Sequence, residues 1–256
     1  RGGYFMQNSR NLFYSVITLA VFALATSFPT YAQSARSLFS NSSGVTFNAK
    51  SGEVSDKATS TSGASQKESY SGLRYELLQE FPNGEVKKVS PNKTFKDGDR
   101  IKVILSSNKT GELSVVNIDP QGKPSLLMEK RISAGENINV PTKGFLKFVG
   151  EPGVEQLIFA LSAKSMKQKA AELGNPMTTI ISSCFRNQNT RSLAIEDSAG
   201  NQSALIDSNG KCAESNKATT RSLVVDVSED SGYAVIPDNA LAEGQILTLK
   251  INLRHN

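Results

Sequence analysis

Cys184 and Cys212 are the two cysteines of this 256-residue chain. They lie about 28 residues apart, which excludes the CxxC spacing of thiol–disulfide oxidoreductases. In an exported protein an even number of cysteines indicates a disulfide, because the extracytoplasmic compartment is oxidising. Closing a loop of about 28 residues would stabilise a fold by roughly 3 kcal/mol. We therefore predict a structural Cys184–Cys212 disulfide rather than a redox-active or nucleophilic cysteine.

Other residue types that carry catalysis or bind metals form no recognisable pattern in the sequence. The single histidine, His255, leaves little material for histidine-based catalysis or for a metal site with several histidines. The GxSxG, HExxH, Walker and dinucleotide-binding glycine motifs are missing from the sequence. We predict no catalytic, cofactor-binding or metal-binding residue and no cofactor. Serine and lysine are frequent, however, so a Ser-Lys hydrolase stays as an alternative.

Two acidic segments resemble fragments of cation sites. Asp97-Gly98-Asp99 places two carboxylates two residues apart, and Asp207-Ser208-Asn209-Gly210 matches part of an EF-hand loop. Calcium needs several more converging oxygen ligands than either segment offers. Asp-Gly and Asn-Gly pairs favour tight turns, because these residues accept positive φ. We therefore expect a turn before a strand at residues 97–99 and a hairpin turn at 207–210.

The N-terminal region has the layout of a secretory signal peptide. Arg10 supplies a positive charge, Leu12–Ala25 is mainly apolar, and small residues surround an expected cleavage site between Ala32 and Gln33. The alternative, a membrane anchor, needs roughly 20 apolar residues, more than this run provides. Residues 1–5 precede Met6, the expected natural start.

The charge balance does not indicate nucleic-acid binding. The whole chain has a formal net charge of +5, and loss of Arg1 and Arg10 with the signal peptide lowers it to +3. Such a small surplus favours solubility and lacks the basic clusters of nucleic-acid-binding proteins. We expect a periplasmic or secreted bacterial protein with no stable membrane span after processing.

The region after the signal peptide is expected to be a disordered Ser/Thr/Gly-rich tether over residues 33–70. Its apolar residues are too few to offset the entropy of ordering the chain. Leu38 and Phe39 are the exception, and they could dock a short strand onto the folded body.

From residue 71 onward, apolar and polar residues alternate as in strands with one buried face. Turn signals separate the strands, and one helix is expected over 164–173, ended by Gly174 and Pro176. These features predict a mainly β protein, an antiparallel β-sandwich with one short helix and a disulfide-linked C-terminal hairpin region. The clearest strands are Arg100–Ser106, Leu113–Ile118, Leu157–Leu161 and Leu247–Leu253.

A series of short motifs lies between residues 70 and 163. They are Gly72-Leu73-Arg74-Tyr75, Val89-Ser90-Pro91, Phe95 to Ile101, Ser107-Asn108, Gly111, Ala134-Gly135, Val140-Pro141 and Pro152 to Glu155. In order and spacing these motifs resemble a bacterial extracytoplasmic module, domain of unknown function family 4384, and Ala35 to Phe39 resembles the lead-in of some members. The resemblance implies a β-sandwich-like fold and an envelope or secreted setting, and it carries no known catalytic residue.

The C-terminal part contains a weak internal repeat at an offset of 30 residues. Thr190-Arg191-Ser192-Leu193 recurs as Thr220-Arg221-Ser222-Leu223, which two neighbouring hairpins would explain. We therefore expect residues 71–163 to form the sandwich core. Residues 164–256, a helix plus strands, either complete the same sandwich or form a small domain.

These observations favour an exported, non-enzymatic β-sandwich module that binds a protein or a cell-envelope component through strand edges and loops. One alternative is a hydrolase of envelope substrates that uses loop carboxylates, which would need two of them within about 5–10 Å of each other. Another is a structural subunit of a secretion or surface assembly, in which edge strands pair with neighbours. The sequence does not predict an oligomeric state.

Overall fold

The computed structural model describes residues 34–43, 46–47, 54–55, 69–186, 195–196, 202–212, 223–227, 231–242 and 244–256. The predicted signal peptide (1–32), its cleavage site between Ala32 and Gln33, and most of the predicted tether lie outside these residues. Within the described ranges, no helix is long and apolar enough to cross a membrane.

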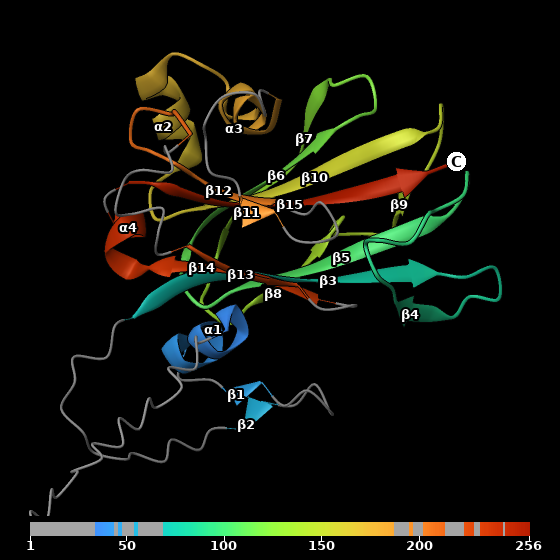
Figure 1. Ribbon diagram of the computed structural model, residues 1–256, viewed down its shortest axis with the longest axis horizontal. Coiled ribbons are helices and arrows are strands. Elements are labelled where there is room, and N and C mark those ends of the chain that lie inside the picture. The colour runs from blue at the N-terminus through green and yellow to red at the C-terminus, as the bar shows by residue number, and fades with distance from the viewer. Residues whose placement is uncertain are drawn as a thin grey trace, which may run out of the picture. The chain divides into compact units, whose positions relative to one another are not determined.

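Two antiparallel sheets pack face to face, which confirms the predicted mainly β, sandwich-like fold (Figure 1). Three of the predicted strands, Leu113–Ile118, Leu157–Leu161 and Leu247–Leu253, lie at the centre of the six-stranded sheet, and Arg100–Ser106 lies in the other sheet. In the six-stranded sheet, β10 and β15 pair from Gly153–His255 to Ser162–Ile246. The strand order in this sheet is β11 (Ile195–Glu196), β12 (Gln202–Ile206), β15 (Ile246–His255), β10 (Gly153–Ser162), β6 (Gly111–Ile118) and β7 (Pro124–Ile132).

The second sheet has seven strands and is also antiparallel throughout. Its centre is the pair β3 and β5, which runs from Leu73–Ser107 to Glu80–Arg100. The strand order is β13 (Val224–Val227), β14 (Ser231–Pro237), β3 (Tyr70–Glu80), β5 (Arg100–Ser107) and β8 (Asn137–Val140), and β4 (Val86–Lys88) and β9 (Leu146–Lys147) pair with β3 and β5.

One apolar core fills the space between the sheets. Because side chains alternate between the two faces of a strand, every second residue of the central strands enters this core. Each fully buried aliphatic or aromatic side chain contributes roughly 1.5–3 kcal/mol relative to exposure. The largest members include Leu73, Tyr75, Leu77, Ile101, Leu105, Leu113, Phe159, Leu249, Ile251 and Leu253.

Helices cover the outer face of the six-stranded sheet. The predicted helix at 164–173 is confirmed as α2 (Met166–Leu173), with the Ser165 hydroxyl accepting a bond from the Gln168 amide and Gly174 in the left-handed region at its end. A second helix, α3 (Met177–Arg186), was not identified from the sequence. Its apolar residues recur at helical spacing and face the sheet: Met177, Ile180, Ile181, Cys184 and Phe185.

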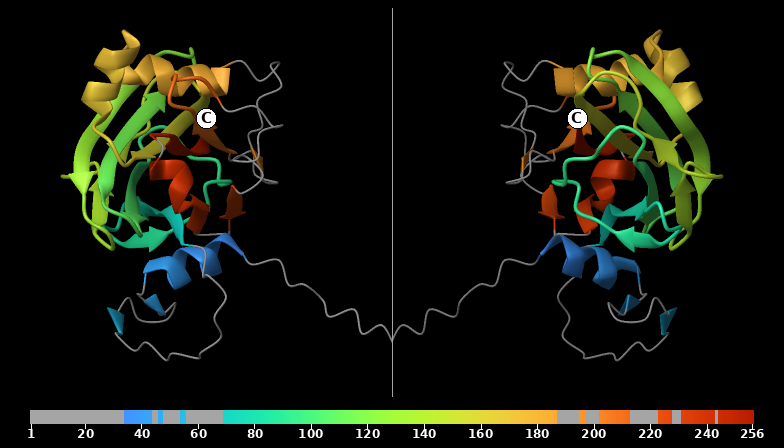
Figure 2. Two further views of the ribbon diagram at one scale, coloured as in Figure 1. Left: turned by 90° about the vertical axis from the view of Figure 1, so that its left-hand side faces the viewer. Right: turned by 90° about the vertical axis from the view of Figure 1, so that its right-hand side faces the viewer.

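A third helix, α1 (Ala35–Ser43), lies on the outer face of the seven-stranded sheet, opposite α2 and α3 (Figure 2). The disordered tether predicted for residues 33–70 therefore does not begin at residue 33, because Ala35–Ser43 is helical. Leu38 and Phe39 contact the folded body as part of this helix and not as a strand. Both side chains are buried, and the Phe39 ring packs edge-on against Tyr233 at 5.6 Å between ring centroids. Gly72 permits this approach, because a Cβ there would lie 2.8 Å from Phe39 Cδ2.

Asn108, at the start of the β5–β6 turn, ties α1 to the sheet. Its buried amide oxygen accepts a hydrogen bond from the Gly72 amide at 2.8 Å. Its Nδ2 donates to the carbonyl oxygens of Phe39 at 3.2 Å and Tyr70 at 2.9 Å. One side chain therefore satisfies backbone groups of both α1 and β3. These bonds fix α1 on the sheet, although the polar composition of α1 does not favour an ordered helix.

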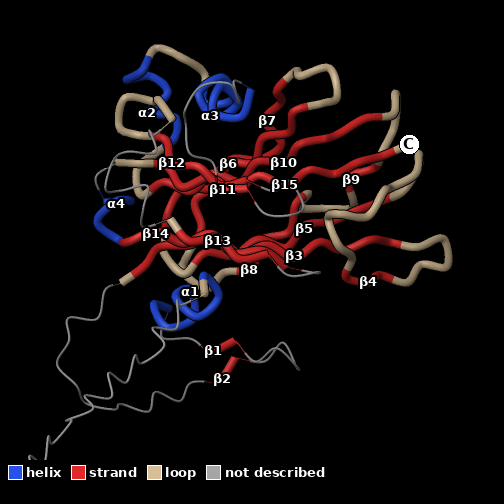
Figure 3. The backbone as a smooth tube through the Cα atoms, in the orientation of Figure 1, coloured by secondary structure: helices blue, strands red, loops and turns tan. Residues whose placement is uncertain are grey.

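The segment 164–256 contributes strands to both sheets, as does 71–163 (Figure 3). At the repeat offset of 30 residues, the hairpin β11–β12 of one sheet corresponds to the hairpin β13–β14 of the other. Most of the recurring Thr-Arg-Ser-Leu residues lie outside the described ranges. Elsewhere, β1 (Thr46–Phe47) pairs with β2 (Val54–Ser55), and the short helix α4 (Asp238–Ala242) follows β14.

Candidate functional site

A pocket of ≈ 240 Å³ opens between the two sheets, on the side where β7 and β9 lie. Its inner wall is apolar and belongs to the sandwich core. Strands of both sheets contribute, so the pocket exists only once the sandwich has assembled. The lining residues are Ile101, Asn117, Leu127, Leu146, Lys147, Phe148, Val149, Glu155, Leu157 and Leu253.

Two polar residues replace apolar ones where the core reaches the pocket. Leu113, Val115 and Asn117 alternate on the inner face of β6, and Glu155 occupies the inner face of β10. The Asn117 side-chain amide donates a hydrogen bond to Glu155 Oε2 at 2.8 Å. Because this pair ends the apolar core, the space beside it is left open to solvent.

Exposed apolar side chains surround the mouth of the pocket. In β7, Val115 pairs with Met128 and Val116 pairs with Leu126, so Leu127 is an extra residue in a β-bulge. Leu127 is 40% exposed, and Val149 on the other side of the mouth is 62% exposed. Apolar groups gathered at a concave site are typical of surfaces that bind a partner.

Strand β7 ends the six-stranded sheet, and no described strand pairs with its outer side. Charged residues occupy its second half, where Lys130 contacts Glu136 at 2.9 Å. A hydrogen bond from the Ser133 backbone, followed by the Lys130 side chain, lowers the pKa of the Glu136 carboxyl. Charges of this kind protect edge strands from unspecific pairing. The first half, around Leu126 and Leu127, lacks such charges.

A Ser–Lys–Asp cluster lies at the start of α4, away from the pocket. Lys109 Nζ contacts Asp238 Oδ2 at 2.7 Å and the Ser69 hydroxyl at 3.1 Å, and the Ser71 hydroxyl donates to Asp238 Oδ1 at 2.7 Å. Burial favours a higher pKa for Asp238, but the bonds from Lys109, Ser69 and Ser71 and the charge of Lys109 hold this pKa below its usual value. These contacts join α4 to β3.

Both acidic segments form turns, as expected. At 97–99, Gly98 has a φ of 87°, and Asp99 Oδ2 accepts a bond from the Lys96 amide at 2.9 Å. At 207–210, Asp207 Oδ1 accepts bonds from the amides of Asn209 and Lys211, each at 2.9 Å. Nowhere in the described ranges do three or more His, Cys, Asp or Glu residues gather as potential metal ligands.

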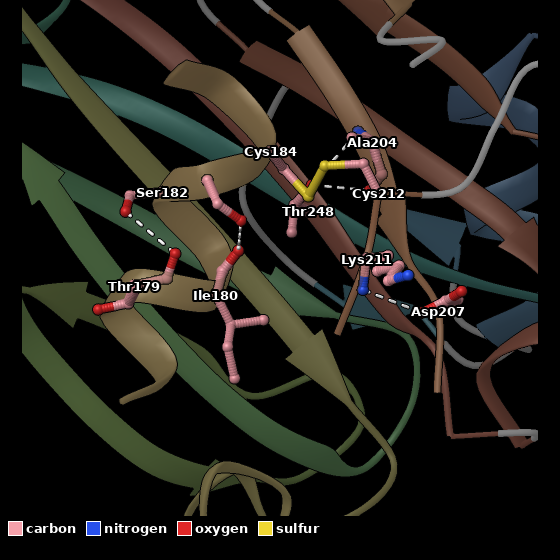
Figure 4. The surroundings of a disulfide bond; sticks show 10 residues. Thr179, Ile180, Ser182, Cys184, Ala204, Asp207, Lys211, Cys212 and Thr248 are labelled. Atoms are coloured by element: carbon pink, nitrogen blue, oxygen red, sulfur yellow. Dashed lines mark hydrogen bonds between the residues drawn. A yellow bond between two sulfur atoms is a disulfide. The ribbon is translucent and has the colours of Figure 1, made fainter. Parts of the chain in front are cut away.

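Cys184 and Cys212 form the predicted disulfide, with 5.4 Å between their Cα atoms. Figure 4 shows the bond beside Ala204 and Thr248 of neighbouring strands. The Thr248 hydroxyl donates a hydrogen bond to the Ala204 carbonyl at 2.7 Å, which links β15 to β12 next to the disulfide. The disulfide joins α3 to the end of the turn that follows β12. It lies in the apolar cluster between the helices α2 and α3 and the outer face of the six-stranded sheet.

His255 is buried and packs against Phe148 at 5.3 Å between ring centroids. Phe148 in turn stacks on Phe95 at 4.8 Å. Neither ring nitrogen of His255 has a hydrogen-bond partner among the described residues. The histidine thus behaves as an aromatic member of the core.

The residues that line the pocket were not predicted from the sequence. The consecutive leucines of β7 carried a signal, because a solvent-facing edge strand seldom shows two exposed leucines in sequence. The sequence contained no signal for the Asn117–Glu155 contact, because this contact depends on the pairing of β6 with β10.

Comparisons of the chain with protein-family models, with curated proteins and with solved structures found no match. The resemblance of residues 70–163 to domain of unknown function family 4384 stays a prediction from the sequence.

Proposed function

We propose that this chain is an exported, non-enzymatic β-sandwich module that binds an envelope protein or a cell-wall component. The observation that carries this proposal is the pocket mouth, where the lining residues Leu127 and Val149 are 40% and 62% exposed. Apolar side chains left in water at one place favour association with a partner that removes them from solvent.

The geometry fits an extended segment of a protein partner best. Strand addition to the free edge of β7 would supply main-chain hydrogen bonds, and alternate side chains of the partner would point toward the pocket. The pocket, at ≈ 240 Å³, is smaller than the roughly 300–1,000 Å³ typical of sites for drug-sized ligands. Its size therefore suits one or two apolar side chains.

Two further observations support the exported, binding role. The Cys184–Cys212 disulfide is compatible with an oxidising compartment. The residues that line the pocket include one carboxylate, Glu155, whereas glycoside hydrolysis uses two. Glu155 is also hydrogen-bonded to Asn117, an arrangement that suits orientation of a bound segment.

Site-specific photo-crosslinking tests the proposal in the native envelope. A photoreactive phenylalanine at Leu127 should capture one discrete partner, whereas the same group at the exposed Asn209, on the β12 turn, should not. Val149→Asp should reduce capture from position 127 by about tenfold, because a charge in an apolar contact costs at least roughly 1–3 kcal/mol. Equal labelling from positions 127 and 209, or capture unaffected by Val149→Asp, would contradict the proposal.

A further inference from the structure

Among the residues that the structure describes, helix α1 covers one part of the outer face of the seven-stranded sheet. Helix α1 packs on β14 and on the beginning of β3, around Tyr70, Gly72 and Tyr233. The outer side of β4, of the second half of β3, of β5 and of β9 lies beyond this area and is called the basic face below.

The strand registers place a definite set of side chains on the basic face. Because Gly72 faces α1, the even-numbered residues of β3 point outward, together with their direct partners on β4, β5, β8 and β9. Cations outnumber carboxylates in this set. Its members are Arg74, Glu76, Leu78, Glu80, Val86, Lys88, Arg100, Lys102, Ile104, Asn139 and Lys147.

The two carboxylates of the basic face are neutralised within it. Glu76 contacts Arg74 and lies 3.1 Å from Lys88 Nζ. Glu80 lies 2.8 Å from Arg100.

Two of the five cations of the basic face lack a carboxylate partner within the described ranges, and the five cations exceed its two carboxylates by three. Lys102 and Lys147 have no carboxylate within ion-pair distance among the residues that the structure describes. The basic face therefore carries positive charge that its own side chains do not compensate.

Apolar groups lie among these charges. Lys102 Nζ is 4.5 Å and the Arg100 guanidinium carbon 5.2 Å from the centre of the Phe145 ring. Stacking over the ring holds both cations close to the sheet. Leu78 and Ile104 are half-buried between the charged rows, and Val86 at the margin is 44% exposed.

We infer that the basic face is a second binding surface, which shares Lys147 with the lining of the pocket, and that it takes an acidic polypeptide segment containing apolar residues. The unpaired cations Lys102 and Lys147 complement carboxylates, and the apolar groups complement interspersed apolar side chains. A densely charged polymer such as a sulfated polysaccharide fits less well, because it offers no apolar side chains for contact with Phe145, Leu78 and Val86.

Binding of defined polymers to the full-length protein tests this inference. A fluorescent Glu-Tyr copolymer is the probe, and polyglutamate, dextran sulfate and vesicles containing anionic phosphatidylglycerol are the comparisons. We expect the copolymer to bind more tightly than polyglutamate, with an affinity that falls as salt is added. Lys102→Glu should weaken copolymer binding about fivefold, since the substitution removes one attractive charge contact and introduces a repulsive one.

Three matched variants make the test specific. Lys211→Glu changes the net charge equally but lies on the β12 turn, so it should change the affinity less than twofold. Phe145→Ala should weaken binding of the copolymer more than binding of polyglutamate. Leu127→Asp, at the pocket, should leave copolymer binding unchanged, which separates this inference from the proposed function.

Several results would overturn the inference. One is no copolymer binding at low ionic strength, and another is an equal loss in Lys102→Glu and Lys211→Glu. A third is tighter binding of dextran sulfate or of anionic vesicles than of the copolymer with the same dependence on Lys102, which would assign the face to a glycan or a membrane surface.

Discussion

Replacement of Asn108 by alanine should lower the free energy of unfolding by about 3 kcal/mol. The substitution removes an acceptor for the Gly72 amide at 2.8 Å and a donor to the carbonyls of Phe39 and Tyr70. The amide of Gly72 is buried, and leaving such a donor unsatisfied costs about 1–3 kcal/mol. The two carbonyls add less, roughly 0.5–1.5 kcal/mol each at most, because each carbonyl oxygen has a second lone pair that can find another donor.

Equilibrium unfolding in urea measures this loss. The chain has no tryptophan, so far-UV circular dichroism and tyrosine fluorescence are the suitable signals. Asn139→Ala is the matched control, since Asn139 is exposed on β8 and its loss should change stability by less than about 0.5 kcal/mol. Amide exchange in α1 should also accelerate in Asn108→Ala, because the helix loses its link to β3. A loss below about 1 kcal/mol, or one equal to that of Asn139→Ala, would refute the assigned role of Asn108.

Three further predictions concern the disulfide, the histidine and the cluster at α4. Replacing Cys184 and Cys212 together by alanine should cost about 3–4 kcal/mol, from a loop with a sequence separation of 28, and an unchanged urea midpoint would contradict this. His255→Phe should change stability by less than about 1 kcal/mol or raise it, because neither ring nitrogen is bonded, and a larger loss in thermal melts would reveal an unrecognised contact. The pKa of Asp238 is lowered in the folded state, so its stabilising effect is present above the unfolded pKa near 4 and disappears as the pH falls through the lower folded value. Asp238→Asn should therefore be less stable than the natural protein at pH 7 and equally stable at pH 2, and a constant difference across melts at these pH values would show that this linkage is wrong.

The strands could be predicted from the sequence because their signal is local. Leu247, Leu249, Ile251 and Leu253 alternate with polar residues, and burial on one face of β15 follows directly from that period. Gly174 likewise ended α2 where expected, because only glycine adopts the left-handed conformation there at little cost.

The helices α1 and α3 could not be predicted in the same way. The segment Thr178-Thr179-Ile180-Ile181 of α3 is β-branched and favours strands by intrinsic preference. Its helical form depends on burying one face against the outer side of the six-stranded sheet. Helix α1 depends on Asn108, which lies 69 residues from Phe39 in the sequence.

The pocket and the basic face were also beyond the sequence. Asn117 and Glu155 meet only through the register of β6 with β10, and Lys102 and Lys147 share a face only through the pairing of β5 with β9. Each residue on its own resembles an ordinary surface residue. Tertiary pairing therefore decides which polar residues become a site.

The bulge at Leu127 has a consequence for how the length of this chain can change. Removing one residue from a regular strand turns every later side chain to the opposite face. Here Leu126 and Met128 already pair with consecutive residues of β6, so loss of Leu127 would leave the facing of both unchanged. Deletion of the codon for Leu127 would remove one side of the pocket mouth and preserve the sheet. Residue 127 is therefore the position in β7 at which a single insertion or deletion could create or remove the apolar pocket mouth.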